Sequence, residues 1–106
     1  MPKSIIHIIS NLEKSLWGLY GGRFSRLILF GSRARGDADE GSDVDVLVVL
    51  KGEVNAEKEI GRATPTTAAL SLKHNVVISC VYVSEEQYRR EKSTLLINVR
   101  REGVPV

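Results

Sequence analysis

The sequence predicts an α/β protein built on a small mixed β-sheet with helices packed on it. Three short runs rich in β-branched residues and leucine, at 26–30, 44–50 and 76–83, alternate with segments whose apolar residues recur at helical spacing. Strands that alternate with helices in this way are typical of one sheet covered by helices. The chain has 106 residues, which fits one domain, so residues 1–106 are expected to form a single unit.

The first helix is expected at residues 4–20, where isoleucines and leucines spaced three and four apart make one apolar stripe. Two adjacent glycines, at 21–22, should end it. The first strand, 26–30, is stopped by Gly31, and a polar stretch follows. The second strand, 44–50, is almost entirely β-branched or leucine, which favours extended structure.

A helical region is expected at 54–73. Pro65 should start, stop or bend a helix there, because proline lacks the N–H that a helix interior uses. The third strand follows at 76–83. A helix-capping sequence then predicts a helix at 85–92, and a last amphipathic helix is expected at 94–102.

Composition and charge narrow the class of protein. With 42% hydrophobic and 26% charged residues, the chain is ordinary for a globular protein and unlike a disordered one. The formal net charge of +2 is too small to argue for direct nucleic-acid binding. The N-terminus lacks the pattern of a secretion signal and no apolar run is long enough to cross a membrane, so the cytoplasm is expected. A domain this small leaves surface that a partner, including a second copy, can cover.

The single cysteine, Cys80, lies in the third strand and is interpreted as a small buried side chain. The two histidines, His7 and His74, are far apart in sequence and have no cysteine cluster beside them. This spacing does not predict a zinc site.

Two short polar motifs lie at the ends of the first two strands. Gly31-Ser32 leaves a strand, where a glycine lets the backbone approach a phosphate and the serine hydroxyl and following N–H groups can donate to it. Asp43 and Asp45 are two positions apart, so they share one face of a strand, about 6–7 Å apart at Cα. They repel each other, and Mg²⁺, which prefers oxygen ligands, would compensate them. Each motif alone is more often a turn or a cap, but together they predict a triphosphate and metal site.

Gly31-Ser32, ten intervening residues and Asp43-Val44-Asp45 resemble the signature of the DNA polymerase β-like nucleotidyltransferase superfamily. The segments 31–36 and 42–46 are most similar to its minimal nucleotidyltransferase branch, and the resemblance covers most of the chain. It implies a nucleotidyltransferase-like fold and transfer of a nucleotidyl group, most simply AMP from ATP, to a hydroxyl. Members of this branch are often antitoxins, and their helical HEPN partner is an RNase modified on tyrosine.

The resemblance also implies roles for single residues. Ser32 would contact the β- and γ-phosphates, with Gly31 giving access. Asp43 and Asp45 would be the catalytic, Mg²⁺-binding pair. In the same loop, the cations at positions 33 and 35 have two readings of equal weight: Arg33 and Arg35 contact phosphates or the acceptor, or they are solvated charges.

One departure from the family pattern concerns the third strand. Active members usually carry a third carboxylate on the next core strand, but 76–83 contains no Asp or Glu. Ser79 is the expected occupant of that position, with its side chain on the same side of the sheet as Asp43 and Asp45. Loss of this acid need not abolish metal binding, but it argues against fast transfer.

Two functions of different classes remain open, and the enzyme is favoured. In the first, the protein is a nucleotidyltransferase that uses ATP or another nucleoside triphosphate. In the second, it is a binding module that neutralises a partner by covering it and keeps a vestigial nucleotide site. A third function, an accessory subunit for nucleic acid, is disfavoured by the near-neutral charge.

Overall fold

The computed structural model describes residues 3–39 and 41–106. In chain order the elements are α1 (Lys3–Tyr20), the 3₁₀ turn η1 (Gly21–Arg23), β1 (Phe24–Phe30), α2 (Ser32–Arg35), β2 (Val44–Leu50), α3 (Ala56–His74), β3 (Ile78–Ser84), α4 (Glu85–Arg90), α5 (Thr94–Glu102) and β4 (Val104–Pro105). They form a sheet of order β3-β2-β1-β4, in which β2 and β3 are parallel and β1 is antiparallel to both of its neighbours. The mixed sheet that the sequence predicts is confirmed.

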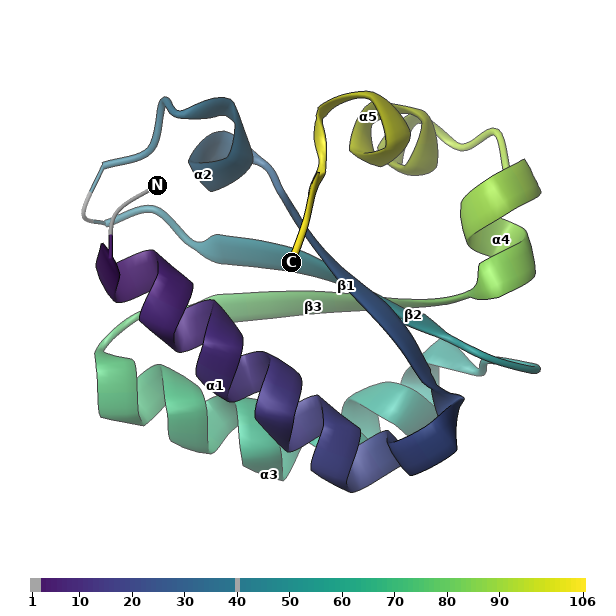
Figure 1. The fold of residues 1–106 in the computed structure, drawn as a ribbon, viewed down its shortest axis with the longest axis horizontal. Helices are drawn as coiled ribbons and strands as arrows, with labels where there is room; N and C mark the ends of the chain where they lie inside the picture. The colour runs from purple at the N-terminus through teal and green to yellow at the C-terminus, as the bar shows by residue number, and fades with distance from the viewer. Residues whose placement is uncertain (1–2, 40) are drawn as a thin grey trace.

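The sheet lies between two layers of helices (Figure 1). α1 and α3 cover one face, and α2, α4 and α5 lie on the other side. The apolar stripe of α1 is buried against the first face, where it meets the inward side chains Val44, Val46 and Val48 of β2. Leu12 and Leu16 of this stripe have no exposed surface, which confirms the helix predicted at 4–20 and its packing on one face.

The second face of the sheet has its own smaller core. Leu47 and Val49 of β2 pack there with Leu96 and Val99 of α5. Because successive side chains of a strand point to opposite faces, β2 contributes to both cores. Within β2 every residue is buried except Asp45, so this carboxylate interrupts an otherwise apolar strand.

α3 runs without interruption through Pro65, which resolves the alternatives that the sequence left open. The ring of a helical proline crowds the carbonyl four residues earlier, and that residue is Gly61, which has no side chain to restrict a local adjustment. α3 ends at His74, and the left-handed conformation of the following residue, Asn75 (φ 51°), redirects the chain. For this reason β3 begins at Ile78, two residues later than predicted.

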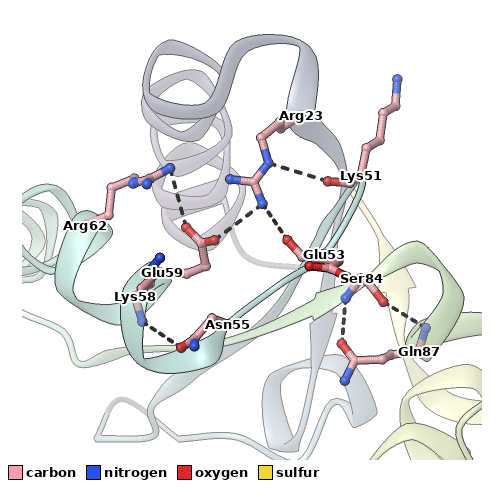
Figure 2. A network of polar contacts seen from close by, with 9 residues as sticks. All are labelled: Arg23, Lys51, Glu53, Asn55, Lys58, Glu59, Arg62, Ser84 and Gln87. Atoms are coloured by element: carbon pink, nitrogen blue, oxygen red, sulfur yellow. Dashed lines mark hydrogen bonds and ion pairs between the residues drawn. The ribbon is translucent and has the colours of Figure 1, made fainter.

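A polar network fixes the connection between β2 and α3 (Figure 2). The Arg23 guanidinium donates to the carbonyl oxygens of Lys51 (3.4 Å) and Glu53 (3.1 Å) and to the Glu59 carboxylate (3.4 Å). Glu59 is almost completely buried, and its second oxygen lies 3.7 Å from an Arg62 nitrogen. The network therefore holds the first turn of α3 against η1 and the loop that follows β2.

Candidate nucleotide and metal site

Strand order brings the predicted site residues to one end of the sheet. β1 and β2 are antiparallel, and Phe30 at the end of β1 is the Cα partner of Asp45 near the start of β2. Gly31 and Ser32 follow directly. On the other side of β2, the parallel strand β3 places Ser79 opposite Asp45. Three strands thus contribute neighbouring positions to one site.

Gly31 lies in direct contact with the carboxylate of Asp45. Its backbone has φ 76° and ψ −158°, a conformation that favours glycine. A Cβ atom built at this position would lie 2.5 Å from Asp45 Oδ2. Position 31 therefore has to be glycine both for its dihedral angles and for the space that Asp45 occupies.

α2 is a single turn that opens toward the same site. The N–H groups of Ala34 and Arg35 both donate to the Gly31 carbonyl at 3.1 Å, and Gly36 ends the turn in a left-handed conformation. The first N–H groups of a helix, here those of Ser32 and the residue after it, have no carbonyl to bond within the helix. Together with the Ser32 hydroxyl they form a set of donors suited to a phosphate.

Arg33 holds the loop that leads to the aspartates. Its Nε and Nη2 atoms donate to the Ser42 carbonyl at 3.2 and 2.8 Å. The carbonyl belongs to the residue directly before Asp43, so the guanidinium ties α2 to the start of β2. The sequence did not indicate this contact, because it joins two ends of a loop with no regular pattern.

Arg35 is shared between two acids. Its Nε atom lies 3.2 Å from Asp37 Oδ2, and its Nη1 atom lies 3.9 Å from Glu102 Oε2 at the end of α5. All three side chains are substantially exposed, so these pairs contribute little to stability. Arg35 is thus engaged with protein groups and still close enough to act on the charge of Asp45.

The electrostatics of the aspartate pair favour a bound cation. Burial raises the pKa of Asp45, the neighbouring charge of Asp43 raises it further, and Arg35 opposes the shift. A carboxyl whose pKa is raised in this way carries negative charge that the protein compensates only in part. A cation between the two carboxylates would supply the missing compensation.

The donor set fits Mg²⁺ bound together with a nucleotide. Among the residues that the structure describes, no three His, Cys, Asp or Glu side chains group as a metal site would require. Mg²⁺ is commonly held by only one or two carboxylates, with phosphate and water oxygens completing its coordination. Asp43 and Asp45 could provide the two carboxylates, and the donors around Ser32 could receive the phosphates.

Ser79 lies where the sequence argument expected it. As the Cα partner of Asp45 on a parallel strand, it faces the same side of the sheet, in one row with Val81 and Val83. Across residues 3–39 and 41–106 the Ser79 hydroxyl makes no hydrogen bond to another protein group. Ser79 is half-buried, so solvent can reach its hydroxyl beside Asp45.

A separate cavity of about 590 Å³ lies at the opposite end of the sheet, beside the Arg23 network (Figure 2). Its walls include Lys58 and the buried Glu59. Burial, and then the Glu59 charge, raise the pKa of the nearby Tyr20 hydroxyl to about 12. Because Ser84 at the far end of β3 also lines this cavity, it does not belong to the aspartate site.

The chain is similar in sequence to known nucleotidyltransferases. The family model described as nucleotidyltransferase domain matches residues 9–98. A Methanocaldococcus jannaschii protein named "Putative protein adenylyltransferase MJ0141" is 37% identical over 103 residues, which is 96% of this chain and 98% of that protein. A second protein of the same organism, named "Putative protein adenylyltransferase MJ0604", is 40% identical over 83 residues, or 78% of this chain and 77% of that one.

Solved structures share the fold. A structure described as a putative nucleotidyltransferase from Sulfolobus solfataricus has a TM-score of 0.63 at 21% identity. The alignment covers 97% of this chain and 82% of that chain. A mutant of the toxin–antitoxin pair MntA–HpeT has a TM-score of 0.59 at 19% identity, with 90% of this chain and 69% of that chain covered. Across the described part of the chain, no helix is long and apolar enough to cross a membrane.

Proposed function

This chain belongs to the nucleotidyltransferase domain family and is a nucleotidyltransferase, and we propose that its substrate is ATP. The proposed reaction transfers AMP from ATP to a hydroxyl on a protein. Mg²⁺ is the proposed metal. The observation that carries this proposal is the contact between Gly31 and Asp45. Gly31 is the glycine at which the backbone could approach a phosphate, and Asp45 is a carboxylate whose pKa is raised.

Each part of the site has a separate role in the proposed reaction. Ser32 and the N–H groups at the start of α2 bind phosphate oxygens, and Gly31 leaves the space for them. Asp43 and Asp45 would hold Mg²⁺, which would neutralise phosphate charge and favour ionisation of the attacking hydroxyl. Arg33 keeps Asp43 in place through the Ser42 carbonyl.

The transfer itself is an in-line displacement. The acceptor oxygen forms a bond to the α-phosphorus of ATP, the bond from that phosphorus to the bridging oxygen breaks, and pyrophosphate leaves. The hydroxyl proton passes to solvent, since Ser79 offers no carboxylate to receive it. Positioning and charge stabilisation then supply most of the rate, and the reaction is expected to be slow.

A protein acceptor is supported by the names of the two Methanocaldococcus jannaschii relatives. The structural likeness to MntA–HpeT supports the further proposal that the acceptor is the toxin of a two-protein pair. The resemblance of the Gly31-Ser32 and Asp43-Val44-Asp45 motifs to minimal nucleotidyltransferases suggests that this toxin is of the HEPN type. The MntA–HpeT complex was solved as a variant in which two aspartates two positions apart are changed to glutamate. The spacing is the same as that of Asp43 and Asp45.

A second candidate function is neutralisation of a partner by binding alone. One observation favours it: Ser79 lies beside Asp45. Active members of the superfamily that the sequence resembles usually carry a carboxylate at this position. In this function the nucleotide site would be vestigial, and the partner would be silenced by being covered.

The two functions are separated by one experiment with the product of the neighbouring gene. The chain is incubated with that protein, Mg²⁺ and labelled nucleoside triphosphates, and the partner is analysed by intact mass spectrometry. Enzymatic function predicts addition of a nucleotidyl group that disappears in Asp43→Asn/Asp45→Asn. If the partner stays unmodified but is neutralised equally by both forms of the chain, the binding function is correct.

A further inference from the structure

We propose that His7, Asn11 and His74 form a binding site for a transition-metal ion of the Zn²⁺ class, separate from the aspartate site. The sequence spacing of the histidines did not predict it. The fold brings them together because α1 and α3 lie side by side on the same face of the sheet (Figure 1). The two imidazole rings meet edge to face, with centroids 5.8 Å apart and an interplanar angle of 83°.

The convergence of ring nitrogens carries the proposal. Asn11 Nδ2 lies 3.5 Å from His7 Nε2 and 3.3 Å from His74 Nε2. A neutral imidazole whose Nε2 carries no proton has a lone pair there, which can accept a hydrogen bond or bind a metal ion. Both ring nitrogens therefore lie within 3.5 Å of one amide atom, and a metal ion would bind between the three side chains.

The third ligand is available without moving the backbone. His7 and Asn11 are four residues apart on α1, so their side chains lie one turn apart on the same side of the helix. Rotation of the Asn11 amide replaces its nitrogen by the oxygen Oδ1, which coordinates cations. Two imidazoles, one amide oxygen and water then complete a tetrahedral set, with metal–nitrogen distances of about 2.0–2.1 Å.

Ligand type decides the class of metal. Imidazole nitrogen suits Zn²⁺, Ni²⁺ and Cu²⁺, whereas Mg²⁺ prefers oxygen ligands and binds imidazole poorly. The site is also open to solvent, because His7 is exposed and His74 is half-buried. An ion can therefore enter it without unfolding of α1 or α3.

Binding at this site would tie two elements together. His7 lies near the start of α1, and His74 is the last residue of α3. His74 also lines a cavity of about 480 Å³ together with Arg33 of α2 and Asp39 of the loop before the aspartates. A bound ion would hold the C-terminal end of α3 against the start of α1 and raise the melting temperature of the protein.

The test uses untagged Asp43→Asn/Asp45→Asn protein, in which a transition metal cannot bind the nucleotide site. Titration calorimetry with Zn²⁺ is expected to give one ion per chain, and Co²⁺ should produce visible absorption bands. Adding His7→Ala or His74→Ala should each weaken Zn²⁺ binding by at least about tenfold. Lys14→Ala, an exposed change on α1, should leave it unchanged.

The proposal is overturned if no ion binds, or if the two histidine variants bind Zn²⁺ as tightly as their parent. Wild-type protein titrated in excess Mg²⁺ must give the same result, so the test does not depend on the aspartate variant. Because nucleotidyl transfer is not measured, failure of this site leaves the proposed function untouched. Failure of the aspartate site likewise leaves these three side chains in place.

Discussion

At the scale of single residues, Gly31 and Asp45 depend on each other more closely than any other pair in the site. The backbone conformation of position 31 excludes most side chains, and the Asp45 carboxylate occupies the space where a Cβ would lie. Gly31→Ala should therefore destabilise the protein by about 1–3 kcal/mol. The same change should displace Asp45 and weaken ATP binding. Urea denaturation and titration calorimetry on the variant measure the two effects.

Gly22→Ala is the matched control for this prediction. Gly22 has no positive φ, and a Cβ there would meet no atom within 4 Å. Its stability should stay close to that of the wild type. Equal stability of Gly31→Ala and Gly22→Ala would show that the contact with Asp45 does not constrain position 31.

Asp45 predicts a pH dependence of stability in the metal-free protein. The pKa of its carboxyl is raised in the folded state, so the folded protein binds a proton more tightly than the unfolded chain. Stability should fall as the pH rises from the unfolded pKa through the folded one, and the loss should persist at neutral pH. Asp45→Asn removes this loss. Unfolding free energies measured from pH 4 to 7 should show the variant gaining on the wild type, and a constant difference would contradict the assignment.

Ser79→Asp tests the missing carboxylate. A positioned acid or base typically contributes ~10²–10⁴-fold to a rate, so the new carboxylate beside Asp45 should raise nucleotidyl transfer or create it. If Ser79 is only a core residue, the change buries an unpaired charge and lowers the melting temperature. Both quantities are measured on the same variant, and a destabilised protein without a gain in transfer refutes the role proposed for position 79.

Some of the site could be predicted from the sequence because it depends on local geometry. Asp43, directly before β2, and Asp45 near its start are close enough for the Asp43 charge to raise the pKa of Asp45, as their spacing predicts, and Gly31-Ser32 follows a strand that is visible in the sequence. The contacts of Arg33 with Ser42, and of His7 with His74, depend on how distant segments come together. No periodicity in the chain signals such contacts.

At the scale of elements, the predicted boundaries were most accurate where apolar residues recur at regular spacing along the chain. α1, β2 and α5 have nearly the boundaries that the apolar pattern gives, since each buries a defined face. β4 was not predicted. It is only two residues, Val104–Pro105, paired with Ile28 and Leu29 of β1, and a pair so short has no pattern of its own.

The connection between β2 and α3 provides a prediction at this scale. Arg23→Ala removes hydrogen bonds to Lys51 and Glu53 and leaves the longer Arg62 contact as the ion pair of the buried Glu59 within the described residues. Since Arg23 is partly exposed, we expect a loss of about 2 kcal/mol, below the range for fully buried pairs.

Arg23→Lys distinguishes charge from geometry in this network. A lysine keeps the positive charge beside Glu59 but cannot reproduce the forked contacts of the guanidinium. An intermediate stability in urea denaturation is expected. If Arg23→Ala unfolds at the same urea concentration as the wild type, the network does not hold α3.

At the scale of the whole molecule, the two faces of the sheet have different roles. One face is filled by α1 and α3 and supplies most of the buried core, while the other carries the smaller core under α5 and ends at the aspartates. The fold class could be predicted because β-rich and helical segments alternate. Strand order could not, because it depends on which edges meet after the helices have packed.

Asp43 and Asp45 are proposed to bind the metal that holds ATP. Titration calorimetry with ATP and Mg²⁺ tests this proposal on the wild type, on Asp43→Asn/Asp45→Asn, and on Glu57→Gln/Glu91→Gln, which removes two exposed negative charges elsewhere. We predict Mg²⁺-dependent binding to the wild type and to the control pair, and none to the aspartate variant, whose melting temperature without metal is equal or higher. Undiminished Mg²⁺-dependent ATP affinity in the aspartate variant would contradict the account.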